Sequence, residues 1–326
     1  MPMAHSNLLL LDKLHQLICY NVIGDLQYQN RYVGFNGELS FMEWYSEHRP
    51  HHNIFDGGYF MPTVEGNSCY QDSIYFTVSS DSFEDYLLIY KHLSYLQLKR
   101  YFFIQYDDNI APENWEQIDL LGTGISLPVP VFKVWEFMTD TASFKEGSIN
   151  DLLSNYEKIE QYKPVNRVPH ELGKRWIAKL EKFDHKLITQ LYVQRLIFDG
   201  LMGFKVKRGI PSDIDCIVMN EKGKLVFVEV KEKDPSKRGT PGFGMDVHRI
   251  ESLTHLASAT KLNVAYVVRR VKDQVTREFV EWRSISILDF IDKLDENPIE
   301  GGTGMRSVHS SNPTYICALA HFTIIR

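Results

Sequence analysis

Apolar residues recur along the chain at two spacings, which predict a mixture of helices and strands. Over 8–22 and 83–98 they recur every three or four residues, as they do on one face of a helix. Over 58–63, 73–79 and 101–106, aromatic and β-branched residues cluster between Gly, Asn and Asp, which is typical of strands. The first half of the chain is therefore predicted to be a mixed α/β region.

The second half shows a clearer order of elements. Asn220-Glu221-Lys222-Gly223 has the composition of a hairpin turn and separates two apolar runs. An Asp at 246 is placed to cap the helix that follows it. In chain order we expect a helix over 183–200, strands over 204–207, 214–219 and 225–231, a helix after 246, strands over 263–271 and 279–287, and a short helix over 288–294. This order predicts helices packed on one mixed sheet.

Length and local composition indicate two domains in an α/β protein. The 326 residues exceed the roughly 150 of a typical single domain. We expect an acidic, aromatic-rich α/β domain over 1–157 and a second α/β domain over 179–326, in which a mixed sheet is flanked by helices. A basic linker over 158–178, which contains Pro164 and Pro169, would join them.

The net charge of −6 hides a strong asymmetry. Residues 1–157 carry 8 Lys and Arg against 21 Asp and Glu, whereas 158–210 carry 12 against 5, and 211–326 carry 16 against 16. Because nucleic acid requires cations to replace its counterions, the carboxyl-terminal half is the better candidate for binding it. The acidic first half is expected to regulate, to contact a protein partner, or to orient a limited reader surface.

The sequence predicts neither a membrane-spanning helix nor a framework of disulfide bonds. The longest leucine run, 8–11, is interrupted by Asp12 and Lys13, and no basic leader with a cleavage site precedes it. Four cysteines (Cys19, Cys69, Cys216 and Cys317) are widely separated and form no CxxC motif. We expect free thiols in a reducing, cytoplasmic environment.

Charged residues gather on the predicted hairpin. Side chains alternate across a strand, so Glu229 and Lys231 share one face, and Asp213 and Asp215 share a face of the preceding strand. Folding the hairpin would bring an aspartate beside Glu229. Two carboxylates and the backbone carbonyl of Val230 are hard oxygen ligands, which suit Mg²⁺ or Mn²⁺.

At these positions the sequence resembles the PD-(D/E)XK nuclease superfamily. Pro211-Ser-Asp-Ile-Asp215 is similar to its first motif and Glu229-Val-Lys231 to its ExK motif, over about residues 180–290 and none of the first half. The sequence of these motifs is most similar to that of Holliday-junction resolvases and Mrr-type restriction enzymes. The resemblance implies a restriction-endonuclease-like core and a Mg²⁺-dependent DNA endonuclease of phage defence, recombination or repair. It also implies that Asp215 binds metal, with Asp213 ranked behind it, and that Lys231 assists catalysis.

One departure from the family keeps alternatives open. Many of these enzymes carry a metal-linked Glu on the first helix, whereas this helix offers Gln190 and Gln194. Gln194 is therefore a candidate in place of that Glu, and the number of metal ions stays open. The alternatives are a catalytically silent module that binds nucleic acid or a protein partner, and a ribonuclease with the same site. Cutting both strands would favour a two-fold homodimer.

Basic residues flank the acidic motif on both sides and are candidates for contacting DNA phosphates. They are Lys205, Lys207, Arg208, Lys233, Lys237, Arg238 and Arg249. For any one of them, a solvated surface charge or a salt bridge is about as good an interpretation. The His48-Arg-Pro-His51-His52 cluster lacks a matching second ligand group and is interpreted as a polar loop. Gly301-Gly-Thr-Gly304 lacks the Lys-Ser/Thr of a P-loop and is interpreted as a connector.

Overall fold

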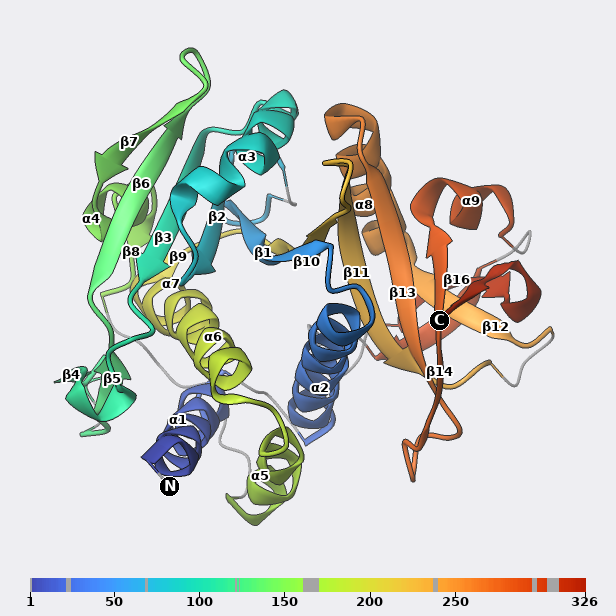
Figure 1. Cartoon of the computed structure of the whole chain (residues 1–326), viewed down its shortest axis with the longest axis horizontal. Coiled ribbons are helices and arrows are strands. Elements are labelled where there is room, and N and C mark those ends of the chain that lie inside the picture. Colours follow the sequence, from blue (N-terminus) through green and yellow to red (C-terminus); the bar gives the residue numbers. More distant parts are fainter. Residues whose placement is uncertain are drawn as a thin grey trace. The chain divides into compact units, whose positions relative to one another are not determined.

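The computed structural model describes residues 2–21, 25–67, 70–120, 122, 124–160, 170–236, 240–294, 298–303 and 311–326. The chain has α/β architecture, with a mixed sheet flanked by helices (Figure 1). Its contacts group it into two compact units, each built from two chain segments. The first unit comprises Met1–Asn36 and Asp56–Asp213, and the second comprises Gly37–Phe55 and Ile214–Arg326.

Five strands carry the first unit. They lie in the order β1-β2-β3-β6-β7, with β2 and β3 parallel and the other neighbours antiparallel. Fully buried aromatic rings, among them Phe60, Phe76 and Phe102, fill the core around them. The strands are β1 (Asn53–Pro62), β2 (Ser73–Ser79), β3 (Arg100–Tyr106), β6 (Phe132–Met138) and β7 (Ser143–Gly147).

Helices and short strand pairs complete the first unit. Two of its helices, α1 (Pro2–Cys19) and α6 (His185–Arg195), pack on each other, and α6 also contacts β2. Beyond Arg195 the helix widens into a π-helical turn, Leu196–Leu201. The remaining elements are α3 (Leu87–Leu93), α4 (Ile149–Leu153), α5 (His170–Ile177), α7 (Met202–Lys205), and the pairs β4 (Glu116–Ile118) with β5 (Leu127–Val129) and β8 (Glu157–Lys158) with β9 (Val206–Lys207).

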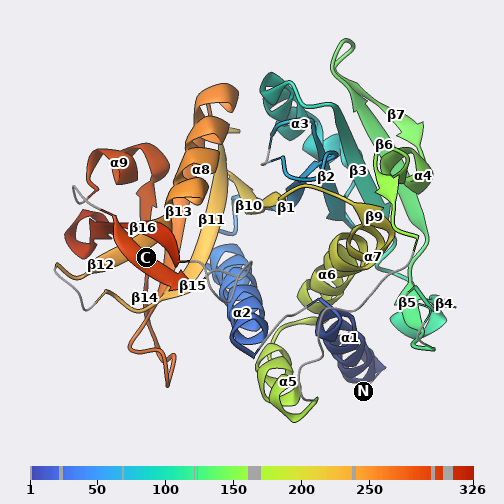
Figure 2. The same cartoon turned by 180° about the vertical axis from the view of Figure 1, so that it is seen from behind.

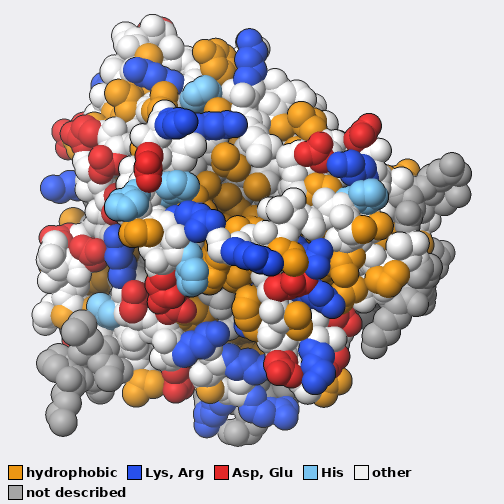
Figure 3. Space-filling model, turned by 45° about the vertical axis from the view of Figure 1, so that its right-hand side comes forward, with side chains coloured by type: hydrophobic (Ala, Val, Ile, Leu, Met, Phe, Trp, Pro, Cys, Tyr) orange, Lys and Arg blue, Asp and Glu red, His pale blue; other side chains and the backbone are white. Residues whose placement is uncertain are grey.

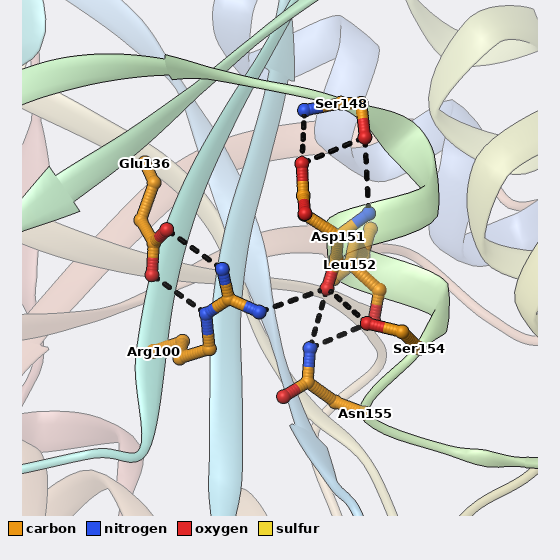
Figure 4. Close-up of polar contacts among 7 residues, drawn as sticks. All are labelled: Arg100, Glu136, Ser148, Asp151, Leu152, Ser154 and Asn155. Carbon is orange, nitrogen blue, oxygen red and sulfur yellow. Dashed lines mark hydrogen bonds and ion pairs between the residues drawn. The ribbon is translucent and has the colours of Figure 1, made fainter.

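Arg100 ties three elements of the first unit together (Figure 4). Its Nε and Nη2 donate to the two carboxylate oxygens of Glu136 at 2.6 and 2.7 Å, and its Nη1 donates to the Asp151 carbonyl at 3.0 Å. Asp151 also closes the capping box of α4 with Ser148. The guanidinium therefore fixes α4 against β3 and β6.

The second unit contains the predicted hairpin. Its five strands lie in the order β17-β14-β13-β11-β10, with β11 and β13 parallel and the other pairs antiparallel. They are β10 (Ser212–Met219), β11 (Leu225–Lys233), β13 (Asn263–Val271), β14 (Phe279–Ser286) and β17 (Thr323–Ile325). Beside them are α8 (Val247–Thr260), α9 (Ile287–Asp292), and a small sheet of β12 (Gly242–Asp246), β16 (Ser311–Ala318) and β15 (Ile299–Thr303).

Two helices cover opposite faces of these strands (Figures 1 and 2). Helix α2 (Asp25–His48) contributes its part from Gly37 onwards, where Phe41 packs edge-on against Trp282. Gly37 lies close to β11, because a Cβ there would be 3.5 Å from the Cβ of Glu232. On the other face, α8 brings Arg249 to Glu229. The alternation of side chains along β11 separates these two faces.

The predicted α/β class, hairpin, helix after Asp246 and strand 263–271 are confirmed. Asp246 occupies the N-cap position, but its side chain makes no capping hydrogen bond to α8 and accepts one from the Thr314 hydroxyl. Helix α2 was not predicted. The stretch 204–207 was predicted to be a strand. Its first two residues end helix α7, where Phe204 is buried, and only Val206–Lys207 form a strand. The unit bounds also differ from the expected 1–157, 158–178 and 179–326, since α6 belongs to the first unit. Among the described helices, none combines the length and apolar character that crossing a bilayer requires.

Candidate metal centre

A tight turn brings the two acidic strands together. The backbone N–H of Asn220 donates to the backbone carbonyl of Lys224 at 3.1 Å. Gly223 adopts φ +72°, a conformation that glycine accepts without strain. The antiparallel pairing of β10 with β11 extends from the turn to Cys216 opposite Val228. The residues just beyond that last pair are the acidic ones.

Three carboxylates converge there. Asp213, Asp215 and Glu229 each offer an oxygen, and these oxygens lie within 4.8 Å of one another. We call these residues the acid cluster. The two aspartates sit on β10, whose residues from Ile214 onwards belong to the second unit, and Glu229 sits on β11. The Glu229 side chain is only 1% exposed, so its charge depends on its neighbours rather than on water.

Two cations neutralise Glu229. Lys231 Nζ lies 2.7 Å from Oε1 of Glu229 and 3.9 Å from Oδ2 of Asp215. Arg249 Nε donates to the same Oε1 at 3.0 Å, and its Nη2 pairs with Oε2. Burial by itself would raise the pKa of Glu229, but the charges of Arg249 and Lys231 outweigh it and lower the pKa to about 2. Glu229 is therefore ionised at neutral pH.

Val230 orients the neighbouring aspartate. Its backbone N–H donates to Oδ2 of Asp215 at 2.6 Å, a short bond to a charged acceptor. The Asp215 side chain is 3% exposed, so this bond and Lys231 fix a nearly buried carboxylate. The expected ligand was the carbonyl of Val230, and that role stays a prediction.

The donor set fits a hard divalent cation. Three carboxylates against the charges of Lys231 and Arg249 leave a net negative charge, and oxygen ligands are those that Mg²⁺ and Mn²⁺ prefer. Asp213, Asp215 and Glu229 would hold such an ion. Because Arg249 contacts both oxygens of Glu229, the ion would share that carboxylate with a guanidinium.

Other predicted site residues have different surroundings. Gln194 lies on α6 of the first unit, and its amide donates to Oδ1 of Asp56 at 3.5 Å. Lys233 donates to the carbonyl of Gly244, and burial lowers its pKa to about 8. The proposed roles of these residues in catalysis and DNA binding stay predictions.

The remaining basic candidates are not gathered with the acid cluster by any contact in the described structure. Lys207 pairs with Glu157 at 2.9 Å in an exposed salt bridge, Lys205 ends α7, and Arg208 lies over the Phe198 ring. Lys237 and Arg238 lie outside the described residues. On the face drawn in Figure 3, lysines and arginines are interspersed with acidic and apolar side chains.

Sequence reasoning missed the position of Arg249 at Glu229. Arg249 was predicted to contact a DNA phosphate or to form a salt bridge, and which carboxylate it meets depends on how α8 packs. The histidine cluster has structural contacts: His48 ends α2 and stacks on Trp44 with ring centroids 4.8 Å apart, and His52 pairs with the Tyr45 hydroxyl at 2.8 Å. Within the described residues, only the acid cluster groups three potential metal ligands.

Comparison with known proteins adds no family to these observations. No protein-family model matches the chain, and neither a search of the curated proteins nor one of the solved structures returns a significant match.

Proposed function

We propose that this protein is a metal-dependent DNA endonuclease whose active site is the acid cluster with Lys231. The observation that carries the proposal is the convergence of three carboxylate oxygens within 4.8 Å, beside an ammonium 2.7 Å from Glu229. Carboxylates next to one lysine match what hydrolysis of a phosphodiester needs: a metal site and a fixed positive charge.

Each residue has a distinct task in this proposal. A Mg²⁺ or Mn²⁺ ion held by the acid cluster would polarise the phosphate and lower the pKa of a bound water. The Val230 N–H fixes the Asp215 carboxylate, which reduces its rotational freedom before the ligand arrives. Lys231, whose side chain is 40% exposed, can approach a phosphate and neutralise charge growing on its oxygens, or position the attacking water.

Cleavage assays test the proposal directly. The purified chain is incubated with plasmid, linear, branched and single-stranded DNA, and with RNA, in Mg²⁺, Mn²⁺, Ca²⁺ or EDTA. We expect cutting of DNA in Mg²⁺ or Mn²⁺, with binding but no cutting in Ca²⁺. Asp215→Ala, Glu229→Gln and Lys231→Ala should each lower the rate at least about 100-fold, while DNA affinity changes little.

The control is Lys224→Ala, which removes an exposed charge from the hairpin turn and should cleave normally. Cleavage that survives Asp215→Ala, or that continues in excess EDTA, would exclude this site. Preferential cutting of RNA would redirect the proposal to a ribonuclease.

One observation favours a second candidate, a catalytically silent nucleic-acid or partner-binding module. Arg249 contacts both oxygens of Glu229, so the carboxylate is already satisfied without an ion. DNA binding that is unaffected by Mn²⁺, with no cleavage of any substrate, would select this candidate.

A further inference from the structure

Three arginines surround a single aspartate in the first unit, apart from the acid cluster in sequence. Asp199 lies in the π-helical turn Leu196–Leu201, and its side chain is 1% exposed. Arg31 comes from α2, Arg195 ends α6, and Arg208 follows β9. We call these four residues the arginine cluster. A π-helical turn widens the helix locally and is frequent at functional sites.

The oxygens of Asp199 are shared by only two of the arginines. Arg31 Nη1 contacts Oδ1 at 2.9 Å, while Arg195 contacts Oδ2 through Nε at 2.6 Å and Nη2 at 2.5 Å. Arg208 forms no ion pair with a carboxylate in the part of the chain that the structure describes. Its guanidinium instead lies 5.0 Å from the centroid of the Phe198 ring, which Arg195 approaches at 4.6 Å.

Hydrogen bonds anchor the backbone directly after Arg208. The next residue, Gly209, donates its N–H to the Pro62 carbonyl at 3.1 Å, and Ile210 donates to the Asn67 carbonyl at 3.0 Å. A Cβ on Gly209 would lie 2.6 Å from two backbone oxygens, so only glycine fits this approach. The backbone that carries Arg208 is therefore positioned by the fold.

The charge of the arginine cluster is not balanced. Three guanidiniums and one carboxylate leave a surplus of two positive charges. Burial lowers the pKa of Arg208, and of the charged groups acting on it, Asp199 raises that pKa whereas Arg31 and Arg195 lower it further. Partial burial of like charges is costly unless an anion offsets it. Arg31 is 19% exposed, which leaves a route for such an anion.

We propose that the arginine cluster binds a phosphomonoester group, with Arg31 and Arg208 as its ligands and Arg195 held in place by Asp199. A phosphomonoester carries close to two negative charges at neutral pH and three strong acceptor oxygens, which matches the surplus of the cluster. Guanidiniums donate in a planar fork that suits phosphate oxygens. The site goes beyond the proposed nuclease activity and does not depend on it.

Calorimetric titration of the full chain in EDTA, which prevents metal-dependent cutting, tests the proposal. The probes are inorganic phosphate, adenosine monophosphate, and a short DNA oligonucleotide with a 5′-phosphate or a 5′-hydroxyl, all at matched ionic strength. We expect phosphate and the phosphorylated probes to bind, and the 5′-hydroxyl oligonucleotide to bind at least about 10-fold more weakly than its phosphorylated form. Among the three probes that carry a phosphate group, the one that binds most tightly identifies the natural source of the phosphate.

Arg208→Gln and Arg31→Gln should each weaken the binding of phosphate about 10-fold or more. Lys91→Ala removes one positive charge from the exposed surface of α3 and should change the affinity less than 2-fold. Arg208→Lys, which keeps the charge, guards against loss of folding and should bind more weakly than wild type. Absence of phosphate binding to the wild-type chain, or equal affinity in Arg208→Gln and Lys91→Ala, would overturn the proposal.

Discussion

Replacing Glu229 with glutamine should destabilise the second unit by about 3 kcal/mol at neutral pH. The pKa of Glu229 falls from the ordinary 4.5 to about 2 because Arg249 and Lys231 outweigh the effect of burial. Since a change of one in pKa corresponds to about 1.4 kcal/mol, the lowered pKa corresponds to about 3 kcal/mol of stability. Removing one partner of a buried ion pair costs about 3–5 kcal/mol in other proteins, which agrees.

The sign of the pH dependence follows from the lowered pKa. The stabilisation is fully present above pH 4.5, where the unfolded carboxyl is also ionised, and is lost as the pH falls towards 2. The wild-type chain should therefore lose its advantage over Glu229→Gln in that interval. Urea unfolding in EDTA at pH 7, 4.5 and 3 measures the difference, and hydrogen exchange of peptides from β11 assigns it to the second unit.

Glu251→Gln is the control, since its partner His248 and the glutamate are both exposed; it should alter stability by less than about 0.5 kcal/mol. Equal stability of wild type and Glu229→Gln at pH 7 would refute the reasoning. So would a difference between them that stays constant from pH 7 to pH 3.

Two further predictions concern buried carboxylates outside the acid cluster. Glu232→Gln should lower the free energy of unfolding by about 3 kcal/mol, because Arg269 and Arg277 each lie 2.9 Å from this buried glutamate. Urea unfolding measures the effect, with the exposed Glu278→Gln as the control. Equal stability of the two variants would contradict the prediction. Burial, to which the charge of Asp81 adds, raises the pKa of Asp56 to about 7, so its ionisation should progressively destabilise the first unit as the pH rises from about 4 through 7. Asp56→Asn should remove this loss in melting curves, and an unchanged pH profile would show that the carboxyl titrates normally.

The candidate site was predictable because its signal is local. A strand, a turn with Gly223 and a second strand place Asp215 near Glu229 whatever the rest of the chain does, since antiparallel pairing follows from the turn. The partner of Glu229 on α8 was less accessible to sequence reasoning. Arg249 lies twenty residues further along, and which side chain it meets depends on tertiary packing.

Helix α2 was not predicted although its buried residues have helical spacing. Tyr28, Tyr32, Phe35, Leu39 and Met42 recur every three or four residues and fall on one face. Gly34 and Gly37, which disfavour the interior of a helix, weaken this signal in the sequence. Val33 and Phe41 are buried outside the stripe. Helix α6 was predicted to belong to the second domain, because it is close in sequence to the hairpin. Its contacts with α1 and β2 lie in the first unit.

The division of each unit into two chain segments has a consequence for synthesis on the ribosome. Residues Gly37–Phe55 of the second unit are made early, and the 158 residues 56–213 must be translated before its remaining segment begins. At about 5–20 residues per second, that delay is about 8–30 s. During it, Phe41 has been made but its partner Trp282 has not. The nascent chain thus carries an unfinished apolar surface while the first unit is completed, and this interval is when a chaperone would have most to protect.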